Sequence, residues 1–436
     1  MDLSIHQPVI ARIQQFEGKQ ITLNGWVYHT RDLRKLVFIQ LRDGTGTIQC
    51  IFNKEEVSEE IFAAAQSAGQ ESSVSITGKV VADPRSPLGF ELQASNIEVH
   101  QAVSDYPIGP KEHGTGFLME HRHLWLRSKR QHAIARIRNE LIKAIRDYFE
   151  WQAFTLVDAP ILTGVACEGT TTLFELDYHG EPAFLTQSGQ LYMEAAAKAF
   201  GRAYCFGPTF RAEKSKTRRH LHEFWMVEPE VSYLDLAGDM ELTEDFVSYL
   251  IGRVCGERTE ELAILERDVG RLKAAARTPY PRLSYDEAVE ILKKEHNIDH
   301  EWGKDFGAEE ETLLASRHDQ PTFIHRFPAA CKAFYMKRDP DNDKLSLSMD
   351  LLAPEGYGEI VGGAQREDDY ETLVGRMREE GIPEQPLSWY LDLRKYGSVP
   401  HAGFGLGIER TLAWICGIKH VRETIAFPRM LEKIWP

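Results

Sequence analysis

The chain has 436 residues, of which 42% are hydrophobic and 27% are charged. These fractions are those of globular proteins and exclude a disordered or fibrous chain. Because a domain commonly holds roughly 150 residues, the length predicts two or three domains.

The N-terminus lacks the basic start and apolar run of a secretory signal, and no stretch reaches the roughly 20 apolar residues that span a bilayer. The six cysteines are far apart in sequence and form no CxxC pair. We therefore expect a cytoplasmic protein with reduced thiols and no membrane partner.

The formal net charge is −15, from 66 acidic and 51 basic residues. Phosphate groups are bound by lysine and arginine, so this total disfavours nucleic acid, and no DNA partner is expected. Binding depends on the local field, however, and residues 121–138 and 211–220 are locally basic. The charge alone therefore does not exclude an RNA partner.

Residues 20–100 contain five short stretches in which apolar and polar residues alternate, which is the pattern of half-buried strands. Residues 55–70, between the third and fourth stretches, have helical composition. Five strands with one helix at this place predict a small β-barrel of the OB type, a fold that commonly binds single-stranded nucleic acid. We assign residues 1–104 to this domain.

Prolines and glycines interrupt the pattern from residue 102 to residue 118 and predict a hinge over residues 105–130. Residues 131–151 then have apolar side chains at helical spacing and lead into a strand that ends at Pro160. Strands and helices alternate after it without a regular βαβ rhythm. This predicts an α+β domain over residues 131–436, with a largely antiparallel sheet flanked by helices. Residues 262–321 are expected to form a peripheral helical insertion.

The sequence contains no GxxxxGK[ST] and no strand-linked GxGxxG, the two commonest phosphate-binding motifs. Residues 210–230 instead predict two strands joined by a charged loop. Arg211 can hold a phosphate through two parallel donors, and Glu213 lies on the same face of the strand. The alternative is a surface hairpin stabilised by ion pairs.

A second stretch, HAGFGLGIERTLAW, begins at His401 and carries three glycines at alternate positions. Glycines let a ligand approach the backbone of a strand closely. The strand leads into an apolar helix with Arg410 near its start. Together the two stretches predict a nucleotide site that does not use a Walker loop.

These stretches resemble the three signature motifs of the class II aminoacyl-tRNA synthetases. Residues 151–162 are similar to the first motif, whose proline, Pro160 here, lies at the homodimer interface in that family. Residues 210–230 resemble the second motif and residues 403–410 the third. With the OB-like region, the resemblance is to the aspartate, asparagine and lysine subgroup and covers nearly the whole chain. The segments FGPTFRAE, RRHLHEFWMVEPE, LAPEGYGEI and GFGLGIER are most similar to those of the asparagine enzymes.

The resemblance implies that the chain uses ATP to join asparagine to tRNA(Asn) through asparaginyl-adenylate. The attacking α-carboxylate is ionised at neutral pH, so catalysis depends on positioning and on neutralising charge rather than on a general base. By similarity, Arg211 would hold the α-phosphate, Arg410 the γ-phosphate and Phe224 the adenine, and the two arginines are the expected catalytic residues. The residues expected to bind ATP are Arg211, Glu213, His220, Phe224, Glu359 and Arg410. Asp350 and Glu359 match the carboxylates that bind Mg²⁺.

Aspartate and asparagine have nearly the same shape, so charge must distinguish them. In the similar aspartate enzymes the stretch QSPQLYK carries a lysine, whereas QSGQLYM places Met193 at that position here. Glu228 is the expected acceptor for the side-chain amide, with Arg366 opposite the side-chain oxygen. A bound aspartate would face Glu228 with like charge. Glu168 and Gln190 match positions that contact the α-amino group.

Arg31, Phe38 and Gln49 match positions of the OB domain that read the central uridine of the anticodon in this subgroup. A phenylalanine can stack on an unpaired base, and the two polar side chains can hydrogen-bond its edge. The resemblance therefore implies that the N-terminal domain binds the anticodon.

The sequence departs from the usual family pattern at Ala364 and Ala402, where serine is common, and this puts the rate of reaction in doubt. Three alternative functions are compatible with the resemblance. They are an aspartate enzyme of relaxed specificity, a non-catalytic paralogue that binds RNA or amino acid, and a paralogue that forms a metabolite. Met193 disfavours the first, the intact site residues disfavour the second, and the complete OB region disfavours the third.

Overall fold

The computed structural model describes residues 8–86, 88–109, 111–165, 167 and 173–436. The chain divides into two compact units, Met1–Gly114 and Thr115–Pro436. Among the described residues, every helix is too short or too polar to cross a membrane.

The N-terminal unit is a closed barrel with the strand order β1-β2-β3-β5-β4. Its elements are β1 (Gln20–Asp32), β2 (Leu36–Arg42), β3 (Thr47–Asn53), α1 (Glu59–Ser67), β4 (Ser73–Ala82) and β5 (Phe90–Gln101). In β2 and β3 every second residue is buried, because successive side chains of a strand point to opposite faces. Five strands with a helix between the third and the fourth confirm the prediction of an OB-type barrel.

An eight-stranded sheet forms the centre of the C-terminal unit, in the order β12-β13-β16-β17-β18-β11-β10-β6. Its strands are β6 (Thr155–Leu156), β10 (Arg202–Phe210), β11 (Glu223–Ser232), β12 (Arg282–Ser284), β13 (Thr322–His325), β16 (Ser348–Ala353), β17 (Gly358–Gln365) and β18 (His401–Gly407). Among the described strands of this sheet, only the pairs at its two ends, β6 with β10 and β12 with β13, are parallel. The prediction of a largely antiparallel sheet in an α+β domain is therefore confirmed.

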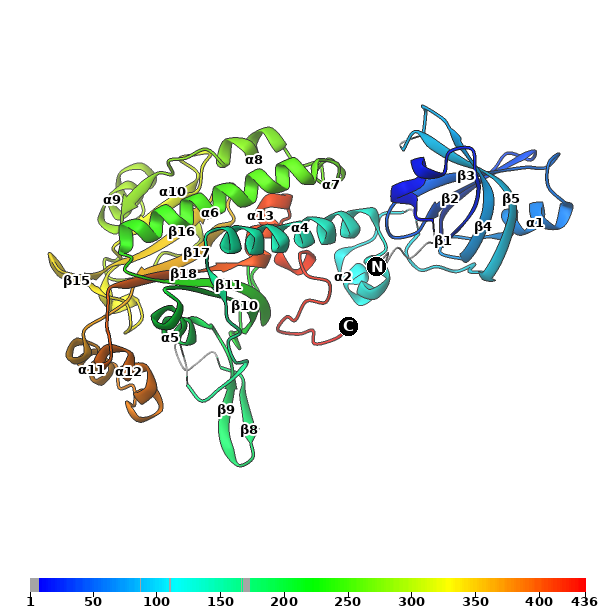
Figure 1. The fold of residues 1–436 in the computed structure, drawn as a ribbon. Helices are drawn as coiled ribbons and strands as arrows, with labels where there is room; N and C mark the ends of the chain where they lie inside the picture. Colours follow the sequence, from blue (N-terminus) through cyan, green and yellow to red (C-terminus); the bar gives the residue numbers. More distant parts are fainter. Residues whose placement is uncertain (1–7, 87, 110, 166, 168–172) are drawn as a thin grey trace. The chain divides into compact units, whose positions relative to one another are not determined.

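Helices α4 (Lys129–Trp151), α6 (Leu236–Glu257) and α13 (Ile408–Cys416) pack on one face of this sheet (Figure 1). The predicted helix over residues 131–151 is α4, which begins two residues earlier. Ser128 caps its start by accepting the N–H of Gln131. Its apolar residues, spaced as predicted, enter the main hydrophobic core. Because these helices cover one face of the sheet, a binding site can form on the opposite face of the central strands.

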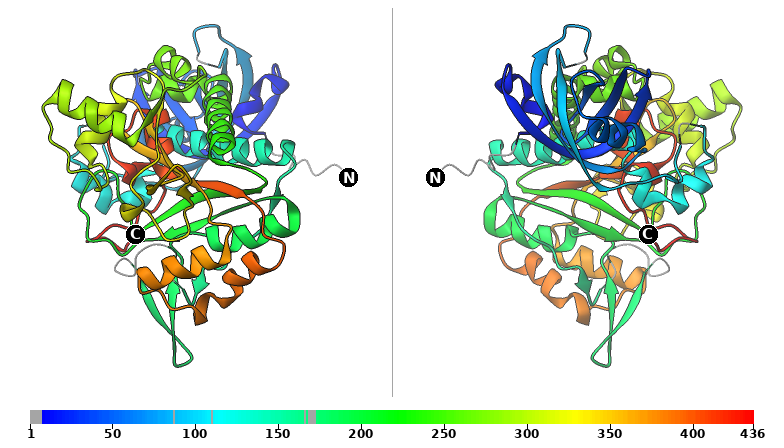
Figure 2. Two further views of the ribbon diagram at one scale, coloured as in Figure 1. Left: turned by 90° about the vertical axis from the view of Figure 1, so that its left-hand side faces the viewer. Right: turned by 90° about the vertical axis from the view of Figure 1, so that its right-hand side faces the viewer.

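The remaining elements surround the sheet. The helices are α2 (Thr115–Glu120), α3 (Arg122–Trp125), α5 (Gln190–Phe200), α7 (Thr259–Ile264), α8 (Val269–Ala275), α9 (Tyr285–His296), α10 (Ala308–Ala315), α11 (Tyr370–Glu379) and α12 (Ser388–Lys395). The short strands are β7 (Leu162–Thr163), β8 (Glu175–Tyr178), β9 (Glu181–Leu185), β14 (Arg338–Asp339) and β15 (Asn342–Ser346). The β8–β9 hairpin projects away from the sheet in every view (Figures 1 and 2). Helices α8, α9 and α10 fall within residues 262–321, and this segment also supplies the edge strand β12.

Candidate active site

The second predicted motif forms an antiparallel hairpin of β10 and β11, in which Phe210 is paired with Glu223. The loop between the strands is closed at its base by the N–H of Arg211, which donates to the carbonyl of His222 at 3.0 Å. Phe224 and Met226 line a pocket on one face of the sheet, whereas the next residue, Val227, lies in the core on the face covered by helices. The hairpin prediction is confirmed, and its alternate side chains point into a pocket.

The third predicted motif forms strand β18 and helix α13. Gly405 and Gly407 line the same pocket as Phe224 and Met226. A Cβ atom on Gly405 would lie 2.4 Å from the Cε of Met226, so only glycine fits here without displacing that side chain. A Cβ on Gly403 would meet the backbone oxygen of Pro229 at 2.2 Å. The alternate glycines therefore permit close packing of β18 on β11 and leave room for a ligand.

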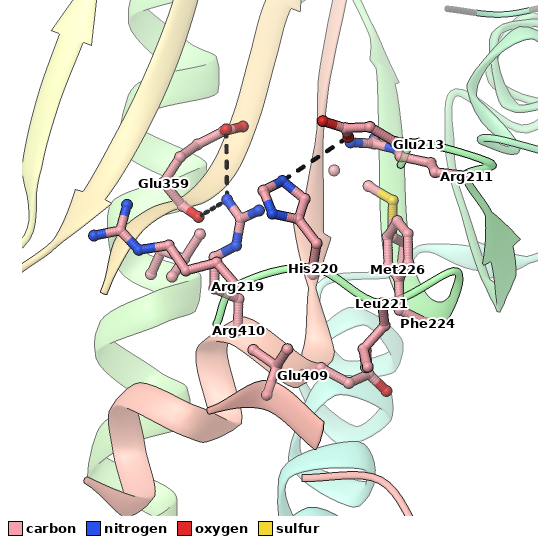
Figure 3. Close-up of a pocket in the computed structure, with 14 residues that line it drawn as sticks. Arg211, Glu213, Arg219, His220, Leu221, Phe224, Met226, Glu359, Glu409 and Arg410 are labelled. Atoms are coloured by element: carbon pink, nitrogen blue, oxygen red, sulfur yellow. Dashed lines mark hydrogen bonds and ion pairs between the residues drawn. The ribbon is translucent and has the colours of Figure 1, made fainter. Parts of the chain in front are cut away.

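Two arginines approach the pocket from different elements (Figure 3). The guanidinium of Arg211 lies 5.3 Å from the ring centroid of Phe224. Arg410, in the first turn of α13, donates from Nη1 to the carbonyl of Glu359 at 2.6 Å and lies 3.7 Å from its carboxylate. Arginines from two motifs about 200 residues apart thus meet around one concave space, which suits a polyanionic ligand.

His220 and Glu213 lie at the mouth of this pocket, with Nε2 of the histidine 3.9 Å from the glutamate oxygen. Burial and the positive charge of Arg410 lower the pKa of His220, although Glu213 opposes the shift. The imidazole is therefore neutral at pH 7. Arg219, which the sequence reasoning did not single out, also lines the pocket and is paired with Glu311 at 3.0 Å.

A second pocket, with a volume of about 400 Å³, adjoins the first. The residues that line both pockets are Arg211, Met226, Glu359 and Gly405. The predicted residues that line the second pocket are Gln190, Glu228, Asp350 and Arg366, together with the shared Arg211 and Glu359. The two pockets therefore form one continuous cleft, and every described residue predicted to contact ATP, amino acid or metal lines one part or the other.

Glu228 is buried at one end of this cleft, where three donors surround its carboxylate. The hydroxyl of Ser188 donates to Oε1, the N–H of Gly189 donates to Oε2 at 2.8 Å, and the Sγ of Cys205 lies 3.5 Å from Oε2. Gln190 begins the following helix, and its Nε2 donates to Glu194 at 3.1 Å. The amide oxygen of Gln190 is consequently the end left to act as an acceptor.

Arg366 is also buried, and it is paired with Glu230 rather than isolated. Its Nε donates to Glu230 at 3.0 Å, and its Nη2 donates to the carbonyl of Gly403 at 2.9 Å. Glu230 raises the pKa of Arg366 against the opposing effect of burial, so the guanidinium stays charged. No local pattern in the sequence indicates this pair, because its members are 136 positions apart.

Asp350 and Glu359 lie on neighbouring strands, β16 and β17, and their carboxylates converge. A Cβ atom built on Gly362 would lie 2.9 Å from an oxygen of Glu359 and 3.6 Å from an oxygen of Asp350. Mg²⁺ in nucleotide sites is commonly held by one or two carboxylates together with substrate phosphates, so these two residues fit such an ion. Among the described residues, no group of three or more metal-ligating side chains is present.

Lys332 contacts Asp350 of this pair and was not predicted. Its Nζ lies 2.8 Å from Asp350 and 3.2 Å from Asp305. Burial raises the pKa of Asp350 to about 7, with Lys332 acting in the opposite direction and Glu359 adding to the rise. A lone lysine in a loop carries no local pattern by which it could have been found.

Several predicted positions lie outside the cleft or outside the described residues. Glu168 lies outside the described residues. Met193 is fully buried among Ala196, Ala203 and Cys205, so an uncharged side chain occupies this position. Ala364 and Ala402 are buried within β17 and β18.

The three predicted anticodon residues lie on the outer face of the barrel. An irregularity in β1 between Val27 and His29 shifts the register, after which Arg31 pairs directly with Phe38 of β2. Gln49 of β3 is paired with Gln40, two residues from Phe38 on the same face. Arg31 is exposed, while Phe38 and Gln49 are half-buried.

Pro160 is exposed and lies in the segment between β6 and β7. Neighbouring apolar side chains are exposed as well, namely Leu156 (38%), Ile161 (45%) and Leu162 (46%). An exposed apolar strip of this kind is typical of a surface that contacts another protein.

A closed five-stranded barrel and a second unit with a continuous cleft on a largely antiparallel sheet together have the architecture of a class II synthetase. Residues 115–431 match the family described as tRNA synthetases class II (D, K and N), and residues 21–99 match the OB-fold nucleic acid binding domain. The chain belongs to the class II tRNA synthetases of the D, K and N group.

Close relatives cover nearly the whole chain. The asparagine–tRNA ligase of Sorangium cellulosum is 58% identical over 99% of both chains, and that of Pelotomaculum thermopropionicum is 54% identical over 98% of this chain and 99% of its own. The crystal structure of asparaginyl-tRNA synthetase from Pyrococcus horikoshii complexed with asparaginyl-adenylate has a TM-score of 0.96 and 43% identity, covering 99% of this chain and all of that one (100%).

Proposed function

We propose that the chain is an asparagine–tRNA ligase that activates asparagine with ATP and transfers it from asparaginyl-adenylate to tRNA(Asn). Relatives of this activity at more than 50% identity over the full length support the proposal. The observation that carries it is the continuous cleft, in which Arg410 lines one pocket, Arg211 lines both, and the buried carboxylate of Glu228 lines the other.

In the activation step, Arg211 lies where the two pockets meet and would hold the α-phosphate under attack. Arg410 would hold the γ-phosphate, and Phe224, on the wall of the nucleotide pocket, would stack on adenine. Glu213 and the neutral His220 would complete the site near the terminal phosphates. Preorganised charges of this kind stabilise the transition state because they need no rearrangement when pyrophosphate leaves.

Asp350 and Glu359 would hold Mg²⁺, which when bound supplies positive charge next to the phosphates. Lys332 already contacts Asp350 at 2.8 Å, so the carboxylate is not left without a counter-ion in the buried cleft.

At the other end of the cleft, Glu228 would accept hydrogen bonds from the side-chain amide of asparagine. Arg366 would face the side-chain oxygen, and the amide oxygen of Gln190 would accept from the α-amino group, which Glu168 would also contact. A bound aspartate would bring a second carboxylate against Glu228 without a proton to share, and the like charges would repel in a site with little water.

For the tRNA, we propose that Phe38 stacks on the central base of the anticodon while Arg31 and Gln49 hydrogen-bond its edge. We also propose a homodimer whose interface includes Pro160 and the exposed apolar strip beside it. The enzyme would act in the cytoplasm, where the buried thiols of Cys50, Cys205, Cys255 and Cys416 would stay reduced.

ATP–pyrophosphate exchange tests the proposed function. We expect exchange with asparagine and Mg²⁺, and loss of about 10²-fold to 10³-fold in kcat for Arg410→Ala, because a positive charge that would stabilise the leaving pyrophosphate is removed. Arg218→Ala, which replaces an exposed arginine of the loop between β10 and β11 that does not line the cleft, is the control and should stay within a few-fold of the parent. Exchange with aspartate alone would contradict the proposed amino acid. Exchange with neither amino acid would favour a non-catalytic protein.

A further inference from the structure

The turn that precedes helix α5 contacts the amino-acid end of the cleft through its backbone. Gly189 is the N-cap residue of α5, with φ −87° and ψ −1°, and Ser188 comes before it. We propose that Gly189, together with Ser188, determines the choice of asparagine over aspartate by holding Glu228 as a fixed acceptor. This inference rests on the proposed function, in which Glu228 meets the side chain of the substrate.

Each oxygen of the Glu228 carboxylate accepts a hydrogen bond from this turn. The backbone N–H of Gly189 donates to Oε2 at 2.8 Å, and the hydroxyl of Ser188 donates to Oε1. The oxygen of Ser188 in turn accepts the N–H of Gln190 at 3.1 Å, which leaves its proton for the carboxylate. The turn is itself braced, because the hydroxyl of Thr186 donates to the carbonyl of Ser188 at 2.8 Å.

The position of Gly189 admits almost no other residue. A Cβ atom there would lie 2.5 Å from the Sγ of Cys205, 2.9 Å from the Cβ of Ala159 and 3.3 Å from Oε2 of Glu228. The absence of a side chain therefore lets the backbone come close enough to donate to the carboxylate. Proline, the residue at this place in the QSPQLYK stretch of the aspartate enzymes, has no N–H to donate.

Two consequences follow for the substrate. Donors on both oxygens favour the ionised carboxylate, which can accept hydrogen bonds but cannot donate one. They also fix the rotation of the carboxylate, which lines the cleft and so stays in place to accept from the amide of asparagine. If the turn supplied fewer donors, Glu228 could rotate or take up a proton, and a protonated carboxyl could donate to the carboxylate of aspartate.

The test compares Gly189→Pro with Gly189→Ala in ATP–pyrophosphate exchange, measuring kcat/KM for asparagine and for aspartate. Both variants add the same Cβ, but only alanine keeps the N–H. We expect the asparagine-to-aspartate ratio of kcat/KM to be about 10-fold to 100-fold lower in Gly189→Pro than in Gly189→Ala, because hydrogen bonds to charged groups are worth about that factor. Ser188→Ala, which removes the second donor without adding atoms, should lower the ratio in the same direction.

Equal losses with both amino acids in Gly189→Pro and Ser188→Ala would overturn the inference, since a purely structural role would not change the ratio. If Gly189→Pro does not fold, as judged by circular dichroism, Ser188→Ala decides, and an unchanged ratio in that variant overturns the inference. A parent enzyme that exchanges with aspartate only, or with neither amino acid, would instead count against the proposed function.

Discussion

The guanidinium of Arg394 and the carboxylate of Glu194 lie 2.6 Å apart, and neither side chain has any exposed surface. Glu194 also accepts from the hydroxyl of Tyr390 at 2.8 Å and lies 3.0 Å from the imidazole of His401. Burial opposes the ionised form of Glu194, but Arg394 and His401 outweigh it and lower the pKa of this carboxyl. Through these contacts Glu194 joins α5 to α12 and β18, and through Gln190 it reaches the cleft.

Replacing Glu194 by alanine should destabilise the protein by about 3–5 kcal/mol, because it leaves the charge of Arg394 buried without an anionic partner. The free energy of unfolding from urea titrations measures this loss. The control is Glu55→Ala, which removes a salt bridge between side chains that are 81% and 72% exposed and should cost about 1 kcal/mol at most. Similar losses in the two variants would show that the buried ion pair stabilises the protein no more than the exposed one.

Replacing Gly403 by alanine should also be strongly destabilising, by about 3 kcal/mol or more, because the new Cβ would overlap a backbone oxygen that cannot move without separating β18 from β11. Gly407→Ala is the matched control on the same strand, since a Cβ at that position meets nothing within 4 Å. Thermal unfolding of the two variants provides the comparison. An equal shift in Tm for both would contradict the role of close strand packing.

The helices and strands could be predicted closely from the sequence wherever one local pattern of apolar residues sets the structure. The apolar spacing of residues 131–151 predicted α4 to within two residues, and alternation predicted the five strands of the barrel. The hairpin of β10 and β11 could be predicted from its two strands and charged loop, and Arg211 was predicted from that hairpin, whereas the role of Phe224 was predicted from resemblance.

The polar contacts behind the cleft could not be predicted in the same way. Gly189 and Glu228 are 39 positions apart, and Glu194 and Arg394 are 200 positions apart. Each contact depends on how helices and strands pack, and neither leaves a periodic pattern in the sequence. The interpretation of Arg366 likewise came from resemblance, and its pairing with Glu230 is visible only in three dimensions.

The stability of the protein should depend on pH through Asp239. This residue lies in the first turn of α6, is fully buried, and has no hydrogen-bond partner for either carboxyl oxygen among the described residues. Burial raises its pKa well above the usual value, with Arg366 acting in the opposite direction and Glu230 adding to the rise. The folded protein therefore keeps a proton that the unfolded chain releases above pH ~4.

Because the folded state binds more protons in this range, the contribution of Asp239 to stability falls as pH rises from about 4 toward its raised pKa. Asp239→Asn removes this ionisation, so the difference in Tm between the variant and the parent should increase in favour of the variant from pH 5 to pH 8. Calorimetric scans at four pH values would measure it. A constant difference in Tm across the pH series would mean that the carboxyl of Asp239 has the same protonation state in the folded and the unfolded chain.

Replacing Phe38 by alanine should weaken the transfer of asparagine to tRNA without changing its activation. Loss of the stacking between one aromatic ring and one base costs about 1–3 kcal/mol of binding free energy, so kcat/KM for tRNA should fall about 10-fold to 100-fold. ATP–pyrophosphate exchange, which needs no tRNA, should stay unchanged.

Phe90 is the matched control, because among the described residues it packs against the barrel core, whereas Phe38 is not part of that packing. Phe90→Ala should therefore lower stability more than Phe38→Ala, and an equal loss of tRNA charging in both would place the effect in the fold of the barrel rather than in base stacking.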